Sequence, residues 1–260
     1  MRKHLFLIVL LIIGLLLFAS CSRDDEKDFP FSSINLNHYE NFSSQGRELV
    51  FYIETLDSFP CSNFLIAVNM HSSPSKMDIH ADNIDVPSHC VTAIGPATRS
   101  ILLGKPERNP PLVSFWVNDK RHDFDLNITE EAIELNKKTV FENHLFFTRE
   151  VLMRIPDNTV WGYIYADTTD KNIIPAGLMD AFAELGAEVM ELPDGDYYYF
   201  KVVDNSPWFS LGEEEISGFS LLFDKSLDLL IAAFEQFAQE SDGVQFKIRL
   251  FNTQGERFLI

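Results

Sequence analysis

The residues best suited to hold another molecule are aromatic and lie near the end of the chain. Tyr197, Tyr198 and Tyr199 are consecutive, and neighbouring side chains of a strand point to opposite faces, so the three cannot all enter one core. Trp208 and Phe209 follow in a polar stretch. Flat rings beside acidic residues suit sugars or peptides. We therefore expect these five residues to contact a glycan or protein ligand; aromatic packing where two domains meet is the alternative.

Residues that could carry out catalysis form no recognised pattern. The sequence has no G-x-S-x-G, H-E-x-x-H or Walker motif, and Ser73–Lys76 fits S-x-x-K without its partner motifs. Asp167 and Asp170 follow a predicted strand, where a glycosidase would need two carboxylates about 5 to 9 Å apart. Capping of the next helix is the simpler use of this pair. The sequence predicts no catalytic residue and a non-enzymatic protein, with a polymer hydrolase as the alternative.

The sequence also shows neither a recognised metal-ligand spacing nor a basic segment. His80, His89 and Cys90 could approach one another, but none of the usual zinc-ligand spacings is present. Asp194–Asp196 is too short for a calcium loop. The formal net charge is −18, which repels phosphate backbones. We expect no metal, no cofactor and no nucleic-acid partner.

The first 20 residues have the composition of a secretory signal peptide. Arg2 and Lys3 precede an apolar run from Leu5 to Phe18, and two small residues, Ala19 and Ser20, follow. The run is shorter than the roughly 20 residues that cross a bilayer. A transmembrane helix and a plain cleaved signal are the alternatives.

Phe18–Cys21 resembles the lipobox of bacterial lipoproteins. The resemblance implies cleavage before Cys21, lipid on its thiol, and contact with the membrane through that lipid alone, because so acidic a chain is repelled by an anionic bilayer. The acidic tract from Asp24 to Asp28 resembles the signal that sends some Gram-negative lipoproteins to the surface. It implies an outer-membrane lipoprotein at the cell surface; a solvated tether over residues 21–46, with one strand near 31–36, is the plain interpretation.

Two cysteines remain once Cys21 carries lipid. Cys61 and Cys90 would lie in an oxidising compartment in an exported chain, where leftover thiols tend to pair. The sequence predicts a disulfide between them, and two free buried thiols are the alternative.

Residues 47–139 read as an all-β domain. Short apolar, often alternating segments are separated by Pro and Gly turns, which is typical of an antiparallel β-sandwich with Ig-like architecture. The Cys–Trp–Cys order of true immunoglobulin domains is absent, because Trp116 follows both cysteines. Thr129–Lys138 reads as a short helix, and residues 140–158 form an ambiguous junction.

Residues 159–260 read as an α+β domain with an antiparallel sheet and two helices on one face. Pro175 opens the first helix and Asp224 or Ser226 opens the second. A hairpin is expected around Pro193–Asp196. The order strand–helix–strand–strand occurs twice, which favours a duplication.

The duplicated order and the segment LPDGDYYYFKV resemble the GyrI-like effector-binding domains. The resemblance implies a cleft for a small molecule between the two halves. A single ferredoxin-like β-α-β-β-α-β sheet with an extra C-terminal hairpin is the competing interpretation. We expect a lipid-anchored binding module of the cell envelope, with a small-ligand sensor as the alternative.

Overall fold

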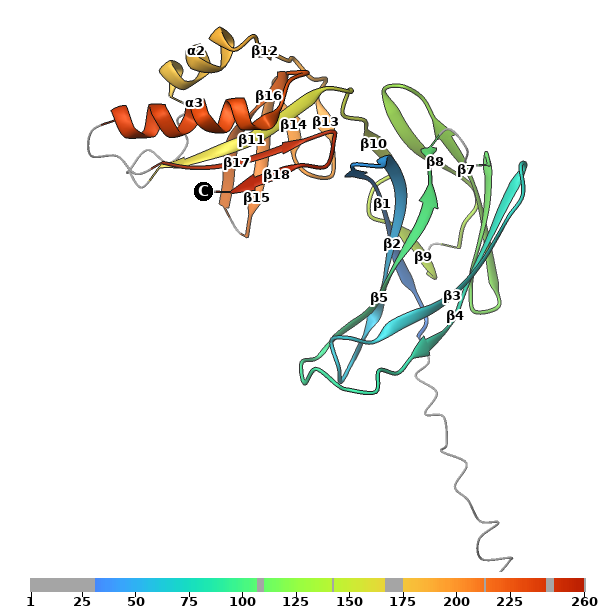
Figure 1. Cartoon of the computed structure of the whole chain (residues 1–260). Helices are drawn as coiled ribbons and strands as arrows, with labels where there is room; N and C mark the ends of the chain where they lie inside the picture. The colour runs from blue at the N-terminus through green and yellow to red at the C-terminus, as the bar shows by residue number, and fades with distance from the viewer. Residues whose placement is uncertain are drawn as a thin grey trace, which may run out of the picture. The chain divides into compact units, whose positions relative to one another are not determined.

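The computed structural model describes residues 31–106, 110–141, 143–166, 175–212, 214–241 and 246–259, which belong to one compact unit, Phe31–Ile260. The expected signal peptide, Cys21, Asp167 and Asp170 lie outside the described residues. Within the described part the chain forms two β-sheets and two helices (Figure 1). Neither helix has the length and hydropathy to cross a membrane.

The first sheet has ten strands. In chain order they are β1 (Ile34–Ser43), β2 (Gly46–Phe59), β3 (Leu65–Ser72), β4 (Lys76–Asp85), β5 (Gly95–Gly104), β6 (Leu112–Val117), β7 (Lys120–Ile128), β8 (Ala132–Thr139), β9 (Leu145–Phe147) and β10 (Val151–Met153). In space the order is β10-β8-β7-β6-β4-β3-β5-β2-β1-β9. Most pairs are antiparallel, and β4–β6, β3–β5 and β1–β9 are parallel.

Strand β1 shows why the chain forms this sheet. Every second residue from Ile34 to Phe42 is buried and the others are half-exposed, which is the period of a strand with one face on a core. β1 pairs with β2 along its whole length, down to Ser43 opposite Gly46. Residues 34–43, expected to belong to a tether, therefore form an internal strand.

The expected two-sheet sandwich is replaced by one curled sheet. The pairs β4–β6 and β3–β5 join all ten strands into a single sheet. Both pairings are non-local, and no local sequence pattern specifies them. Curling brings opposite ends together: the His38 ring on β1 lies 3.3 Å from the Ile133 carbonyl oxygen on β8. β9 and β10 pair with β1 and β8 respectively, so one short segment bridges both ends. The predicted all-β character of this part is therefore confirmed, whereas the predicted Ig-like sandwich is not found.

The prediction of a helix at Thr129–Lys138 is wrong, because Ala132–Thr139 is strand β8. The Thr129 hydroxyl accepts from the Ala132 N–H at 3.0 Å, and so closes a turn rather than capping a helix. Ile133 and Leu135 are buried on one face. Pairing with β7 and β10 outweighs the helix preference of the glutamates.

The second sheet contains eight strands. They are β11 (Thr159–Ala166), β12 (Glu188–Val189), β13 (Gly195–Asp196), β14 (Lys201–Val203), β15 (Ser206–Leu211), β16 (Glu214–Leu222), β17 (Phe246–Asn252) and β18 (Arg257–Leu259). Their order is β13-β14-β15-β16-β11-β17-β18, and β12 pairs with the far end of β16. The strands with helical crossovers therefore lie in the order β17-β11-β16-β12.

Two β-α-β units are interleaved in this sheet. The first runs from β11 through α2 (Ala176–Glu184) to β12, with β16 between its strands. The second runs from β16 through α3 (Leu227–Glu240) to β17, with β11 between its strands. β13–β15 are inserted between the units, and β18 forms a hairpin with β17. This order matches a single β-α-β-β-α-β sheet with additions.

The expected hairpin around Pro193–Asp196 is displaced. β12 pairs with β16 rather than with the tyrosine segment. The turn instead lies at Tyr197–Phe200, between β13 and β14, where Tyr198 has a positive φ of 70°. Pairing of β12 with a strand distant in sequence explains the error.

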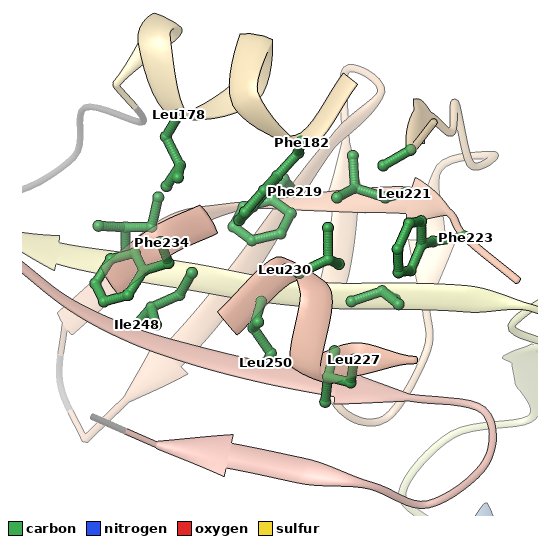
Figure 2. Close-up of a cluster of buried hydrophobic side chains, with 13 residues drawn as sticks. Leu178, Phe182, Phe219, Leu221, Phe223, Leu227, Leu230, Phe234, Ile248 and Leu250 are labelled. Atoms are coloured by element: carbon green, nitrogen blue, oxygen red, sulfur yellow. The ribbon is translucent and has the colours of Figure 1, made fainter. Parts of the chain in front are cut away.

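Both helices cover the same face of the second sheet. Ser226 caps α3 by accepting from the Asp228 N–H at 3.3 Å, whereas Pro175 begins α2 without a side-chain cap. Figure 2 shows the packed side chains between the helices and the sheet. The buried members include Leu178, Phe182, Phe219, Leu221, Phe223, Leu227, Leu230, Phe234, Ile248 and Leu250.

A buried carboxylate holds the first sheet to the segment that enters the second. Glu40 on β1 is 4% exposed, and its side chain accepts from Arg47 at 3.0 Å and from Arg154 at 2.9 Å. Arg47 also donates to the Ile155 carbonyl oxygen at 2.9 Å. The Tyr199 hydroxyl donates to the Glu40 carbonyl oxygen at 2.8 Å. One residue thus ties together three segments distant in sequence.

Two buried histidines make stability depend on pH. Burial lowers the pKa of both His38 and His122 from 6.5 to about 4, while the unfolded chain titrates near 6.5. Between these values the unfolded chain binds more protons, so the free energy of unfolding falls as pH drops from 6.5 to 4, by on the order of 3 kcal/mol per histidine. Urea unfolding across this range measures the slope. His122→Gln is expected to reduce the slope relative to the unsubstituted chain; equal slopes in the two proteins would contradict this.

Candidate functional site

The candidate site is a surface hollow on the hairpin of β14 and β15. Its volume is about 340 Å³. Two strands and the turn between them supply its lining, which consists of Lys201, Val203, Asp204, Ser206, Trp208 and Ser210. We call it the Trp208 hollow.

The local sequence explains why these side chains converge. The turn residues Asp204 and Asn205 both have positive φ, at 52° and 59°, as a two-residue hairpin turn requires. In the resulting register Lys201 lies opposite Trp208. Alternation then separates the two faces of each strand. Val202 and Phe209 are buried in the core, while Lys201 and Val203 of β14 and Ser206, Trp208 and Ser210 of β15 line the hollow.

The chemistry of the Trp208 hollow is mixed. The indole of Trp208 is half-buried and offers a flat apolar surface. Lys201 provides a cation, Asp204 a carboxylate, and two serines provide hydroxyls. A ring flanked by donors and acceptors is the arrangement that binds a ligand having both C–H faces and hydroxyl groups. The hollow is open to solvent rather than enclosed.

Tyr197, Tyr199 and Phe209 lie in or against the core rather than in the hollow. Tyr197 and Phe209 are buried in the aromatic cluster beneath the second sheet, and the half-buried Tyr199 packs against that cluster. Tyr197 stacks on Phe200 with centroids 5.1 Å apart, and its hydroxyl donates to the Pro193 carbonyl oxygen at 2.9 Å. Burial raises the pKa of Tyr197 to about 12 and also raises the pKa of Tyr199.

Tyr198 lies neither in the hollow nor in the core, but against the first sheet. Its ring stacks on Tyr39 of β1, with centroids 4.2 Å apart and planes 8° apart. The Arg149 guanidinium lies 5.5 Å from the Tyr198 centroid, and Arg149 also pairs with Asp196. The tyrosine triplet therefore joins the two sheets, and the structure does not bring it together with Trp208 at one site.

The cysteine, histidine and serine residues singled out in the sequence take part in contacts that stabilise the fold. A disulfide joins Cys61 and Cys90, whose Cα atoms are 5.3 Å apart. The His80 ring stacks on Trp116 at 5.3 Å, while the Ser73 N–H donates to the Lys76 carbonyl oxygen at 2.8 Å in the β3–β4 turn. In the described ranges, no three His, Cys, Asp or Glu side chains come together in a group that could hold a metal ion.

The sequence singled out Trp208 as a candidate but not its neighbours in the hollow. Lys201, Ser206 and Ser210 belong to no motif. The available signal was the Asp204–Asn205 pair between two alternating segments, because that pair predicts a tight hairpin and alternation then places the residues on one face.

The comparisons with known proteins supply no relative. No protein-family model, curated protein or solved structure matches this chain.

Proposed function

We propose that this protein is a lipid-anchored, non-enzymatic module of the cell envelope that binds glycans in the Trp208 hollow. The observation that carries the proposal is the half-buried Trp208 ring set among Lys201, Asp204 and two serines. A sugar ring presents C–H groups on its faces and hydroxyls on its rim. It can therefore stack on the indole while its hydroxyls meet the polar groups.

The shape of the hollow agrees with a ligand of that kind. A volume of about 340 Å³ lies at the lower end of the roughly 300 to 1,000 Å³ typical of ligand sites. Because the hollow is open, it would accept one unit within a longer chain. The flanking cation and carboxylate also suit a charged or aminated sugar.

The anchoring part of the proposal comes from the sequence. The lipobox-like Phe18–Cys21 and the acidic tract after it favour acylation of Cys21 and display at the outer face of the outer membrane. Residues 22–30 then separate the lipid from the compact unit that starts at Phe31. Two or more acyl chains hold a protein firmly to a membrane, whereas one does so only marginally.

Trp208→Ala is expected to weaken glycan binding by about five- to twelvefold, because one stacking contact provides about 1 to 1.5 kcal/mol. A glycan array of bacterial envelope and dietary polysaccharides finds the ligand, and calorimetry with the best one measures the change. Trp116→Ala is the matched control, since Trp116 is also half-buried but lies on the first sheet against His80. Binding that is absent from the array, or equal in both variants, would remove the proposal.

A further inference from the structure

An apolar surface is exposed at one end of the first sheet. Ile94 is 82% exposed, Val91 55%, Val86 54% and Leu56 of β2 51%. We call these four residues the apolar end. The segment 86–96, VPSHCVTAIGP, contains no Asp, Glu, Lys or Arg, in a chain whose formal net charge is −18. An uncharged exposed apolar segment in so acidic a protein indicates a surface that meets another apolar phase.

The loop that carries this surface is fixed in place. The disulfide ties Cys90 to Cys61. Asn63 holds the same loop from both sides, donating to the His89 carbonyl oxygen at 2.7 Å and accepting from the Val91 N–H at 3.0 Å. The Ser62 N–H donates to the Val91 carbonyl oxygen at 3.3 Å. The apolar side chains are thus presented on a braced loop instead of folding back onto the core.

The start of the compact unit lies at the same end. The Ser32 N–H donates to the Asp57 carboxylate at 2.9 Å. The next residue, Ser58, pairs with Pro96, and Phe59 pairs with Gly95 beside Ile94. About two strand spacings of roughly 5 Å each therefore separate Ser32 from the loop. The ten residue steps from Cys21 to Phe31 span at most about 35 Å, so a lipid on Cys21 would hold this end of the fold within that distance of the bilayer.

We propose that the apolar end rests in the lipid bilayer, at the boundary between headgroups and acyl chains; this rests on the proposed acylation of Cys21. The four side chains alone would bind weakly, but the anchor holds them beside the surface and lowers the entropic cost of association. The segment 86–96 itself contributes none of the negative charge that repels anionic lipid. The contact would give the anchored protein one preferred face toward the membrane.

The test uses the chain from Cys21 onward, which contains the whole compact unit. With Cys61 and Cys90 in their disulfide, Cys21 is the free thiol and couples to a maleimide lipid in vesicles of phosphatidylethanolamine and phosphatidylglycerol. Ile94→Trp is expected to emit further to the blue than in buffer, and brominated lipid is expected to quench its added emission about twofold or more. Val189→Trp, at a 72% exposed site on β12, is the matched control and is expected to show neither effect.

The outcomes separate the two proposals. Quenching confined to Ile94→Trp supports bilayer contact, while equal quenching in both variants, or in neither, overturns it and would leave the apolar end to a protein partner. Acylation in the cell is read separately, by labelling with an alkyne fatty acid and comparing Cys21→Ser. Lack of label overturns the anchor that the proposed function requires, and the vesicle result still decides whether the apolar end binds lipid.

Discussion

Glu40→Ala is expected to lower the free energy of unfolding by about 3 to 5 kcal/mol, the range for breaking a buried ion pair by removing one partner. The Glu40 side chain is 4% exposed, and the Arg47 and Arg154 side chains are 15% and 10% exposed. Without the carboxylate two guanidinium groups remain buried beside each other. Their mutual repulsion and lost hydrogen bonds then add to the cavity left by the shortened side chain.

The substitution also loosens the connection between the sheets. Arg154 donates to Glu40 through both Nε and Nη2, at 3.1 and 2.9 Å, and so orients the segment that leads into β11. Arg47 positions the same segment through the Ile155 carbonyl oxygen. We therefore expect lower cooperativity of unfolding in addition to lower stability, because the second sheet would lose its hold on the first.

Glu150→Ala is the matched control. Glu150 pairs with Lys137 at 2.6 Å, but its side chain is 57% exposed, so its loss is expected to cost less than about 1 kcal/mol. Urea unfolding followed by far-UV circular dichroism and by tryptophan fluorescence measures both variants. Similar losses of unfolding free energy in Glu40→Ala and Glu150→Ala would show that burial does not determine how much Glu40 stabilises the fold.

The position of Glu40 shows where sequence reasoning stops. Alternation along β1 places it on the buried face, but a glutamate there reads as an error in the pattern. Its partner Arg154 is 114 residues away, and no local signal joins them. A buried charged residue is tolerated only with such a partner. The alternation along β1 therefore makes sense only once the fold has shown that Arg154 lies beside Glu40.

The same division between local and distant signals runs through the fold. Helices α2 and α3 were predicted because their apolar spacing and first residues are local features. The curled sheet was not, because it depends on β4 pairing with β6 and on β9 and β10 joining its two ends. The segment Thr129–Lys138 carries a helical composition that long-range pairing overrides. Pairings of this kind leave no periodic trace in one sequence.

The candidate site divides in a similar way. Trp208 was chosen as a candidate by residue type alone, since a tryptophan in a polar segment is unusual. Tyr197 and Tyr199 were grouped with it by their position in the sequence. They pack in or against the core instead, because the turn at Tyr197–Phe200 breaks the strand on which the alternation argument depended. Aromatic type indicates a contact without indicating whether its partner is a ligand or the protein itself.

Gly162→Ala is expected to cost about 3 kcal/mol or more, although the backbone of Gly162 suits any residue. Gly162 lies on β11 between Phe219 of β16 and Leu250 of β17. A Cβ there would overlap the carbonyl oxygen of Arg249 and approach the Leu250 side chain to 3.1 Å. A backbone atom in a central strand cannot move without shifting the ladder, so overpacking at this position is severe.

Gly104→Ala supplies the opposite case. Gly104 has a φ of +80°, which disfavours alanine, yet an added Cβ would meet no described atom within 4 Å. Its expected cost is about 1 to 2 kcal/mol, from backbone strain alone. If dihedral angle governed sensitivity, Gly104→Ala would be the more damaging of the two; if close packing of the strands governs it, Gly162→Ala will be. Urea midpoints of the two variants decide between these causes, and a larger loss at Gly104 would contradict the packing inferred for the centre of the second sheet.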